Sequence, residues 1–265
     1  MTARRGCATV RRMAKRPRII VLQPFYTVDA PFDVRLFGIQ CWIADALPAL
    51  QLEVGSSVNR VEGSDTFVHV TMPTDGELRA TLVENEAAYG LLTIFEADGQ
   101  TPRIRVARLV EAQRGRPLRT LERCAFDGET AHLPLAGVEI VRRVAARLGR
   151  KVQPVTWQQA FGTDDLALAD RYLTALGIYA MAEQGIAVIQ PEVALAGLVA
   201  AIEGRVGAAI GFFPNFIECC RRWRLVDEVH MIVAASAAVA ALGEAPAAWI
   251  PTFSKLGLPT SRDLN

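Results

Sequence analysis

Short apolar runs and alternating apolar and polar positions dominate the first part of the chain, which predicts short strands joined by helices. Residues 18–25 are rich in β-branched side chains, and Pro24 stops the run, so we interpret it as a first strand that is buried on both faces. Further strands are expected at residues 52–56, 67–72 and 91–96 and in a hairpin over residues 104–126 that turns near Gly115 and Pro117.

Three stretches in the same region repeat apolar residues every three or four positions, as amphipathic helices do. They cover residues 33–47, 75–86 and 134–149. Thr74 followed by Glu77 has the pattern of a capping box at the start of the second helix. Pro134 suits the first turn of the third helix, and Gly149 suits the position after its end.

After Val155 the apolar residues recur at helical spacing with hardly any alternation, which predicts a region made of helices. The expected helices cover residues 164–184, 192–203, 216–228, 229–242 and 247–255, with breaks at Gly185, Gly204, Pro214, Gly243 and Pro246. The predicted fold class is therefore α+β/α. A small mixed α/β sheet domain over residues 18–153 is followed by an all-helical domain over residues 156–258, and residues 1–17 are expected to be a disordered basic arm.

The formal net charge of +1 conceals an asymmetry between the start of the chain and the rest. Residues 1–18 carry seven Arg and Lys and no acidic residue, which leaves 22 basic and 28 acidic residues in the remainder. Nucleic-acid binding is therefore not expected, except through the arm. The arm also fits a solvated tail, or sequence upstream of a start at Met13 instead of Met1. Residues 114–117, Arg-Gly-Arg-Pro, resemble a minor-groove element, but we interpret them as the hairpin turn.

The chain lacks the patterns of export and of membrane insertion. The basic start has no apolar h-region of a signal peptide, and no run of about 18 apolar residues occurs. The five cysteines form no metal-like pattern, and Cys219 and Cys220 are adjacent. We therefore expect a reduced, cytoplasmic protein without a membrane span.

Few residues are placed to carry chemistry. No Gly-x-Ser-x-Gly, Walker or Gly-x-Gly-x-x-Gly motif occurs, and there are three histidines. His69 fits a packed strand residue, and His132 fits a loop. His230 with Cys219 and Cys220 is the one grouping that suggests a metal site, but on one helix the ligands would be about 16 Å apart. We expect no catalytic, metal or cofactor-binding residue and no cofactor.

The sharpest candidate for a binding surface is the segment Arg221, Arg222, Trp223 and Arg224. Trp and Arg are enriched among the residues that dominate protein–protein interfaces. A structural interpretation is equally open, in which Trp223 packs in the helical core and the arginines lie at the C-terminal end of a helix.

The first domain resembles the TolB-type amino-terminal domain over residues 18–150. The features that carry the resemblance are the step Gln23-Pro24-Phe25 after the first strand, a strand that ends near a glycine, and the hairpin over residues 105–112 followed by Gly115. The chain departs from the family at residues 51–72, where two strands are expected instead of one, and at Leu118, where the family often has an aromatic residue.

The resemblance implies a protein-binding module, because the family commonly precedes tetratricopeptide-type helical repeats. Leu173, Leu176 and Gly177 have offsets that suit such a repeat, but the positions 34 residues later match loosely. A degenerate repeat array and an unrelated helical bundle both remain open. We expect a non-enzymatic scaffold or adaptor with a protein partner, which could be a second copy of the chain. The alternative is an enzyme or small-ligand-binding protein with its site between the two domains.

Overall fold

A computed structural model of the protein describes residues 17–22, 25–26, 33–47, 53–56, 72–98, 101–113, 115–150, 156–186 and 188–261. The predicted arm, apart from Pro17, lies outside these residues, as do both candidate start methionines. The strand expected over residues 67–72 also lies outside them, except for Met72, which is in a connecting segment.

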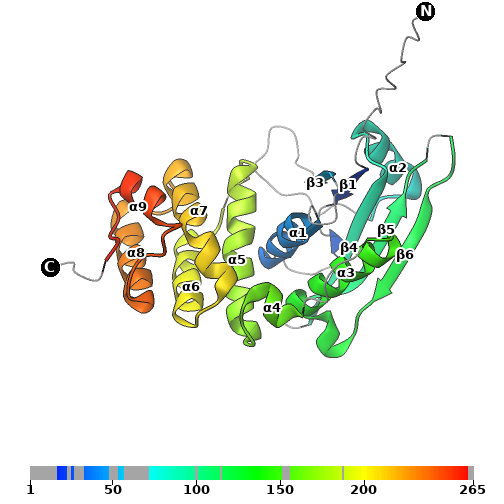
Figure 1. Cartoon of the computed structure of the whole chain (residues 1–265). Coiled ribbons are helices and arrows are strands. Elements are labelled where there is room, and N and C mark those ends of the chain that lie inside the picture. Colours follow the sequence, from blue (N-terminus) through cyan, green and yellow to red (C-terminus); the bar gives the residue numbers. More distant parts are fainter. Residues whose placement is uncertain are drawn as a thin grey trace, which may run out of the picture.

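A mixed six-stranded sheet forms the first part of the described chain (Figure 1). Its path is β3-β1-β4-β5-β6, and β2 pairs with β4 off this path. β1 is parallel to β3 and β4, whereas β4, β5 and β6 are antiparallel. The expected first strand is interrupted, because its two ends belong to β1 and β2. The bounds are β1 (Arg18–Val21), β2 (Phe25–Tyr26), β3 (Glu53–Ser56), β4 (Tyr89–Asp98), β5 (Thr101–Glu111) and β6 (Arg119–Ala125).

Helices cover both faces of this sheet. Alternate side chains of a strand point to opposite faces, so Leu91 belongs to the larger core and Leu92 to a smaller one. α1 (Arg35–Ala46) and α3 (Leu133–Arg147) pack on the larger core, and a 3₁₀ turn, η2 (Gly128–Ala131), precedes α3. α2 (Asp75–Glu84) covers the smaller core with Leu78 and Leu82.

The second part of the described chain is helical, as predicted. Its elements are α4 (Trp157–Phe161), α5 (Leu166–Glu183), α6 (Pro191–Glu203), α7 (Gly207–Trp223), α8 (Glu228–Leu242) and α9 (Ile250–Leu256). The sequence analysis missed the five-residue α4. The small mixed sheet followed by helices confirms the predicted fold class.

The predicted break at Pro214 is wrong, because this proline lies inside α7. A proline within a helix has no N–H for the carbonyl four residues earlier, which here is that of Ile210. The Trp249 indole N–H donates to the Ile210 carbonyl oxygen at 2.8 Å. Trp249 is buried between α7 and α9, with its ring 5.0 Å from that of Phe213. A side chain distant in sequence thus replaces the hydrogen bond that proline removes.

The two parts meet where α1 packs closely against α5. A Cβ atom added to Gly38 of α1 would lie 2.0 Å from the Leu173 carbonyl oxygen, and one added to Gly177 of α5 would lie 2.0 Å from the Val34 carbonyl oxygen. Because residues 38 and 34 meet residues 173 and 177 in reverse order, the two helices run antiparallel. The larger hydrophobic core continues across this contact from the sheet into the helices.

Candidate functional site

The last turns of α5 and α7 lie side by side. Arg222 Nη1 lies 2.9 Å from Glu183 Oε1, and the Trp223 indole N–H donates to the same oxygen at 3.4 Å. α6 runs antiparallel to α5, because Gly204 just after α6 packs against Leu168 near the start of α5. The α5–α6 and α7–α8 connections therefore lie at the same end of the helical part.

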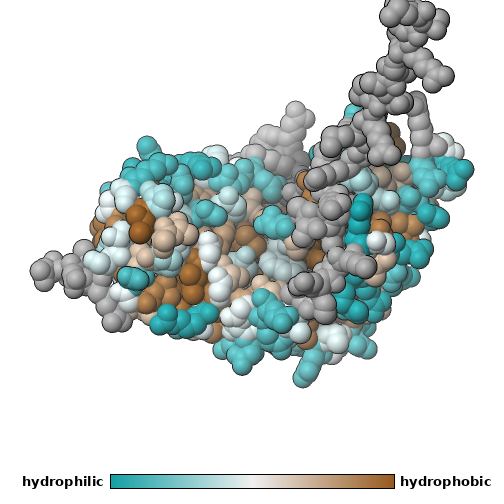
Figure 2. All heavy atoms as spheres, viewed as in Figure 1, coloured by the Kyte–Doolittle hydropathy of each residue, from teal (hydrophilic) through white to brown (hydrophobic). Residues whose placement is uncertain are grey.

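Large apolar side chains are exposed at this end. Relative exposure is 61% for Ile189, 62% for Val193, 69% for Val229 and 62% for Val233. Figure 2 shows further hydrophobic atoms, in brown, on the helical part where Figure 1 draws α6 and α8. We call the exposed residues at the end with the α5–α6 and α7–α8 connections the connecting edge, and they are Ile189, Val193, Arg221, Arg222, Trp223, Arg224, Val229, Ile232 and Val233.

The connecting edge contains all four residues that the sequence analysis singled out, but their side chains lie in two different places. Trp223 is 44% exposed and contacts Glu183 together with Arg222. The large side chain in the helical core is instead Trp249. Arg221 and Arg224 line a separate hollow between α7, α8 and α9. Arg224 is the residue that ends α7, and its backbone is left-handed, with φ of 51°.

The exposed apolar residues of α8 were missed, because Glu228–Leu242 is apolar on every face and the periodicity gives no outward direction. A detectable signal is the pair Val229 and Val233, four residues apart. Buried residues of α8, such as Ala234, Ala235 and Ala238, occupy the other side of the helix. A valine pair opposite a row of buried alanines marks an apolar face that the described part of the chain leaves exposed.

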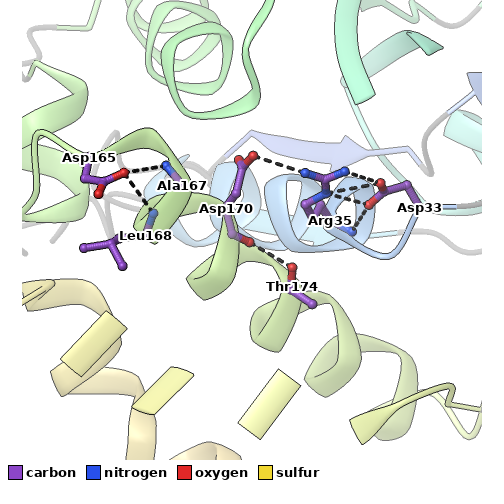
Figure 3. A network of polar contacts seen from close by, with 7 residues as sticks. All are labelled: Asp33, Arg35, Asp165, Ala167, Leu168, Asp170 and Thr174. Carbon is purple, nitrogen blue, oxygen red and sulfur yellow. Dashed lines mark hydrogen bonds and ion pairs between the residues drawn. The ribbon is translucent and has the colours of Figure 1, made fainter. Parts of the chain in front are cut away.

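A polar network lies at one end of the contact between α1 and α5 (Figure 3). Asp33 holds the Arg35 guanidinium at 2.6 Å, and Asp170 of α5 contacts it at 3.1 Å. Burial raises the pKa of Asp170, although the charge of Arg35 opposes the shift. Burial lowers the pKa of Arg35, but the hydrogen bonds and charges of Asp33 and Asp170 outweigh it, so the pKa of Arg35 is raised overall. The groups satisfy one another, and the network joins the two parts.

The residues considered for metal binding are separated in the structure. Cys219 and Cys220 are buried, and burial raises the pKa of each thiol to about 12. His230 Nδ1 is instead 2.6 Å from Asp227 Oδ2. Among the described residues, no group of three or more His, Cys, Asp and Glu side chains is arranged to hold a metal ion.

His132 lies in a polar hollow near the turn of the β4–β5 hairpin, together with Glu96, Arg103 and Arg105. Arg105 pairs with Glu96 at 3.2 Å, and Arg103 donates to the Gly128 carbonyl oxygen at 2.6 Å. These charges are engaged in holding the hairpin to the loop that follows β6.

No helix of the described chain combines the length and the hydrophobicity that crossing a membrane requires.

Comparison with known proteins identifies no family. No protein-family model matches the chain, and no curated protein matches it. The similar solved structures include a PelC dodecamer from Paraburkholderia phytofirmans, which is 13% identical over 53% of this chain and 92% of that chain, with a TM-score of 0.30. A single-residue variant of that dodecamer in another crystal form also has 13% identity and a TM-score of 0.30, over 52% of this chain and 92% of its own. This likeness carries no argument about the function of the chain.

Proposed function

We propose that this chain is a non-enzymatic scaffold or adaptor that binds a protein partner through the connecting edge. The observation that carries the proposal is that exposed apolar side chains of α6 and α8, and Trp223 after α7, lie at the same end of the helical part. We further propose that the sheet part is a TolB-like module, that the helices are a repeat-like array or a helical bundle, and that the protein works in the cytoplasm.

The composition of the connecting edge supports a protein partner. Contiguous exposed apolar surface with a polar rim is typical of interaction sites. Val229 and Val233 would supply apolar burial, whereas Trp223 and its neighbouring arginines are of the types that most often dominate binding energy. A second copy of the chain is one candidate partner.

The contact between the two parts supports a scaffold over an enzyme with a site between domains. α1 and α5 approach so closely at Gly38 and Gly177 that a methyl group does not fit. The charged groups at the end of this contact, Arg35, Asp33 and Asp170, are bonded to one another. This part of the contact leaves no space for a substrate, and its polar groups serve packing.

The test is a pull-down of the tagged full chain from nuclease-treated extract of its own cells, followed by mass spectrometry. Val229→Lys places a charge in the connecting edge, and we expect it to reduce recovery of the partner about tenfold. Val83→Lys is the matched control, because Val83 on α2 is also exposed, at 57%, but lies on the sheet part.

Recovery of one protein near stoichiometrically, lost with Val229→Lys and kept with Val83→Lys, is the expected result. Equal recovery with both variants would place the contact elsewhere on the molecule. The absence of any specifically retained protein, or steady turnover of a small molecule by the purified chain, would contradict a scaffold function.

A further inference from the structure

A hollow of about 470 Å³ opens beside the connecting edge, where the end of α7, the start of α8 and the end of α9 meet. Its lining is mainly apolar and also includes the charged residues Arg221, Arg224, Asp227 and Glu228. The apolar lining consists of Ile217, Leu225, Val226, Met231, Leu256 and Leu258.

The charged side chains around this hollow differ in whether they already form ion pairs or hydrogen bonds. Arg221 and Arg224 are exposed and form no ion pair within the described part of the chain, unlike Arg222, which holds Glu183. Asp227 accepts from the His230 backbone N–H at 2.9 Å and contacts the His230 ring. The hollow is thus lined by two basic and two acidic residues, and among these side chains Asp227 alone forms a hydrogen bond within the described residues. Two guanidinium groups remain for an incoming acid, and each presents several N–H donors that match a carboxylate.

The backbone at Arg224 suits glycine better than arginine. A left-handed conformation is unfavourable for a residue with a Cβ atom, and glycine is the usual residue at this position after a helix. The Leu225 N–H still donates to the Cys220 carbonyl oxygen at 2.9 Å, which closes the helix end. The backbone therefore favours glycine here, as it does at Arg205 after α6, so glycine can replace either arginine without backbone strain.

We infer that this hollow binds an acidic, apolar segment of the protein partner. Apolar side chains of the segment fill the hollow, and a neighbouring Asp or Glu pairs with Arg221 and Arg224. The inference rests on the proposed function, since it names the chemistry of the partner at the connecting edge. A protein segment is favoured over a free fatty acid because the hollow is open and is lined by Arg221 and Arg224 of the connecting edge, so a longer ligand gains contacts outside it.

The test starts from a displayed library of random dodecapeptides selected on the full chain. We expect the enriched peptides to combine Asp or Glu with Leu, Ile or Phe. Synthetic fluorescein-labelled copies of them are then titrated by fluorescence anisotropy. Affinity should fall about tenfold with Arg221→Gln or Arg224→Gly and should weaken as salt rises, because the ion pairs are exposed.

Arg205→Gly is the matched control. Arg205 is also an arginine in a left-handed conformation after a helix, with φ of 62°, but it follows α6 at the opposite end of the helical part. Both glycine variants should keep or raise the melting temperature, because each relieves the same backbone strain. Loss of peptide binding with Arg224→Gly alone therefore reports the side chain and not the fold.

Several results would overturn the inference. These are failure to enrich any peptide, enriched peptides without acidic residues, and equal affinity in Arg224→Gly and Arg205→Gly. Complete displacement of the peptide by decanoate at equal concentration would assign the hollow to fatty acids instead. If any of these results occurs while Val229→Lys still abolishes recovery of a protein partner in the pull-down, the hollow is rejected as the binding site but the proposed function stands.

Discussion

Thr74 and Glu77 fix the start of α2 through reciprocal hydrogen bonds. The Glu77 N–H donates to Thr74 Oγ1 at 3.3 Å, and the Thr74 N–H donates to Glu77 Oε2 at 2.8 Å. This is the capping box that the sequence predicts. The bonds from the Thr74 backbone and side chain to the Glu77 carboxylate lower the pKa of Glu77. The cap is thus strongest when Glu77 is ionised.

Glu77→Ala is expected to lower the free energy of unfolding at neutral pH and to have little effect in acid. The folded-state pKa of Glu77 lies below its ordinary value of 4.5, so the stabilisation is present above that value and is lost as the pH falls through the folded pKa. Urea unfolding of both proteins at neutral and acidic pH measures the difference. Glu84→Ala, at the other end of α2, is the control, and a Glu77→Ala effect that persists unchanged in acid would contradict this role.

At the scale of elements, two glycines determine how α1 and α5 pack. Gly38 and Gly177 each lie against a backbone carbonyl of the facing helix. Small residues at such positions let helix backbones approach closely, and a side chain would force the helices apart because packed interiors have little free space. Glycine is otherwise unfavourable inside a helix, so its presence here follows from the packing.

Gly38→Ala is expected to destabilise the protein by about 1–3 kcal/mol, or to prevent folding, because the added methyl group meets the Leu173 carbonyl. Gly211→Ala in α7 is the matched control, since beyond the backbone of its own helix no atom of the described chain lies within 4 Å of the added Cβ. It should stabilise the protein by about 1 kcal/mol through helix propensity alone. Thermal and urea unfolding measure both changes, and equal effects of the two substitutions would refute the close packing.

The sequence predicts most elements, because their apolar periodicity and caps are local. α5 follows from the spacing of its apolar residues, and the β5–β6 hairpin follows from alternation and the turn at Gly115. Pro214 was misinterpreted because the group that satisfies Ile210 comes from Trp249, which no local pattern reveals. The candidate site divides in the same way. The Arg and Trp residues after Cys220 can be recognised in the sequence, whereas the hollow is also lined by Leu256 at the end of α9 and by Leu258 just after it.

At the scale of the whole molecule, the larger core extends from the sheet to the helical end without interruption. Trp42 of α1 stacks on Phe161 of α4 with ring centroids 5.0 Å apart, and Phe37 packs with Met181 of α5. α1 thus belongs to the sheet part by sequence and packs against both the sheet and α5. The division into residues 18–153 and 156–258 stays a prediction about sequence organisation, and it does not imply two independent cores.

A fragment of residues 156–261 is therefore expected to fold poorly, because loss of α1 exposes the α5 surface around Leu173 and Met181. We expect reduced helical circular dichroism and a broad thermal transition. The chain of residues 17–261, which keeps the described elements of both parts, is the control and should unfold in one cooperative transition. A fragment with dispersed nuclear magnetic resonance signals and a sharp transition would demonstrate an autonomous helical domain.

The hydrogen bond from Trp249 to Ile210 also constrains the order in which mutations can accumulate in this chain. With Pro214 in place, any substitution of Trp249 leaves a helical carbonyl without its donor, in addition to the loss of ring packing. If Pro214 is first replaced by a residue with an N–H, the helix can supply that donor itself, and later changes at position 249 lose only packing. The two positions are therefore expected to show epistasis, with the proline making the tryptophan harder to replace.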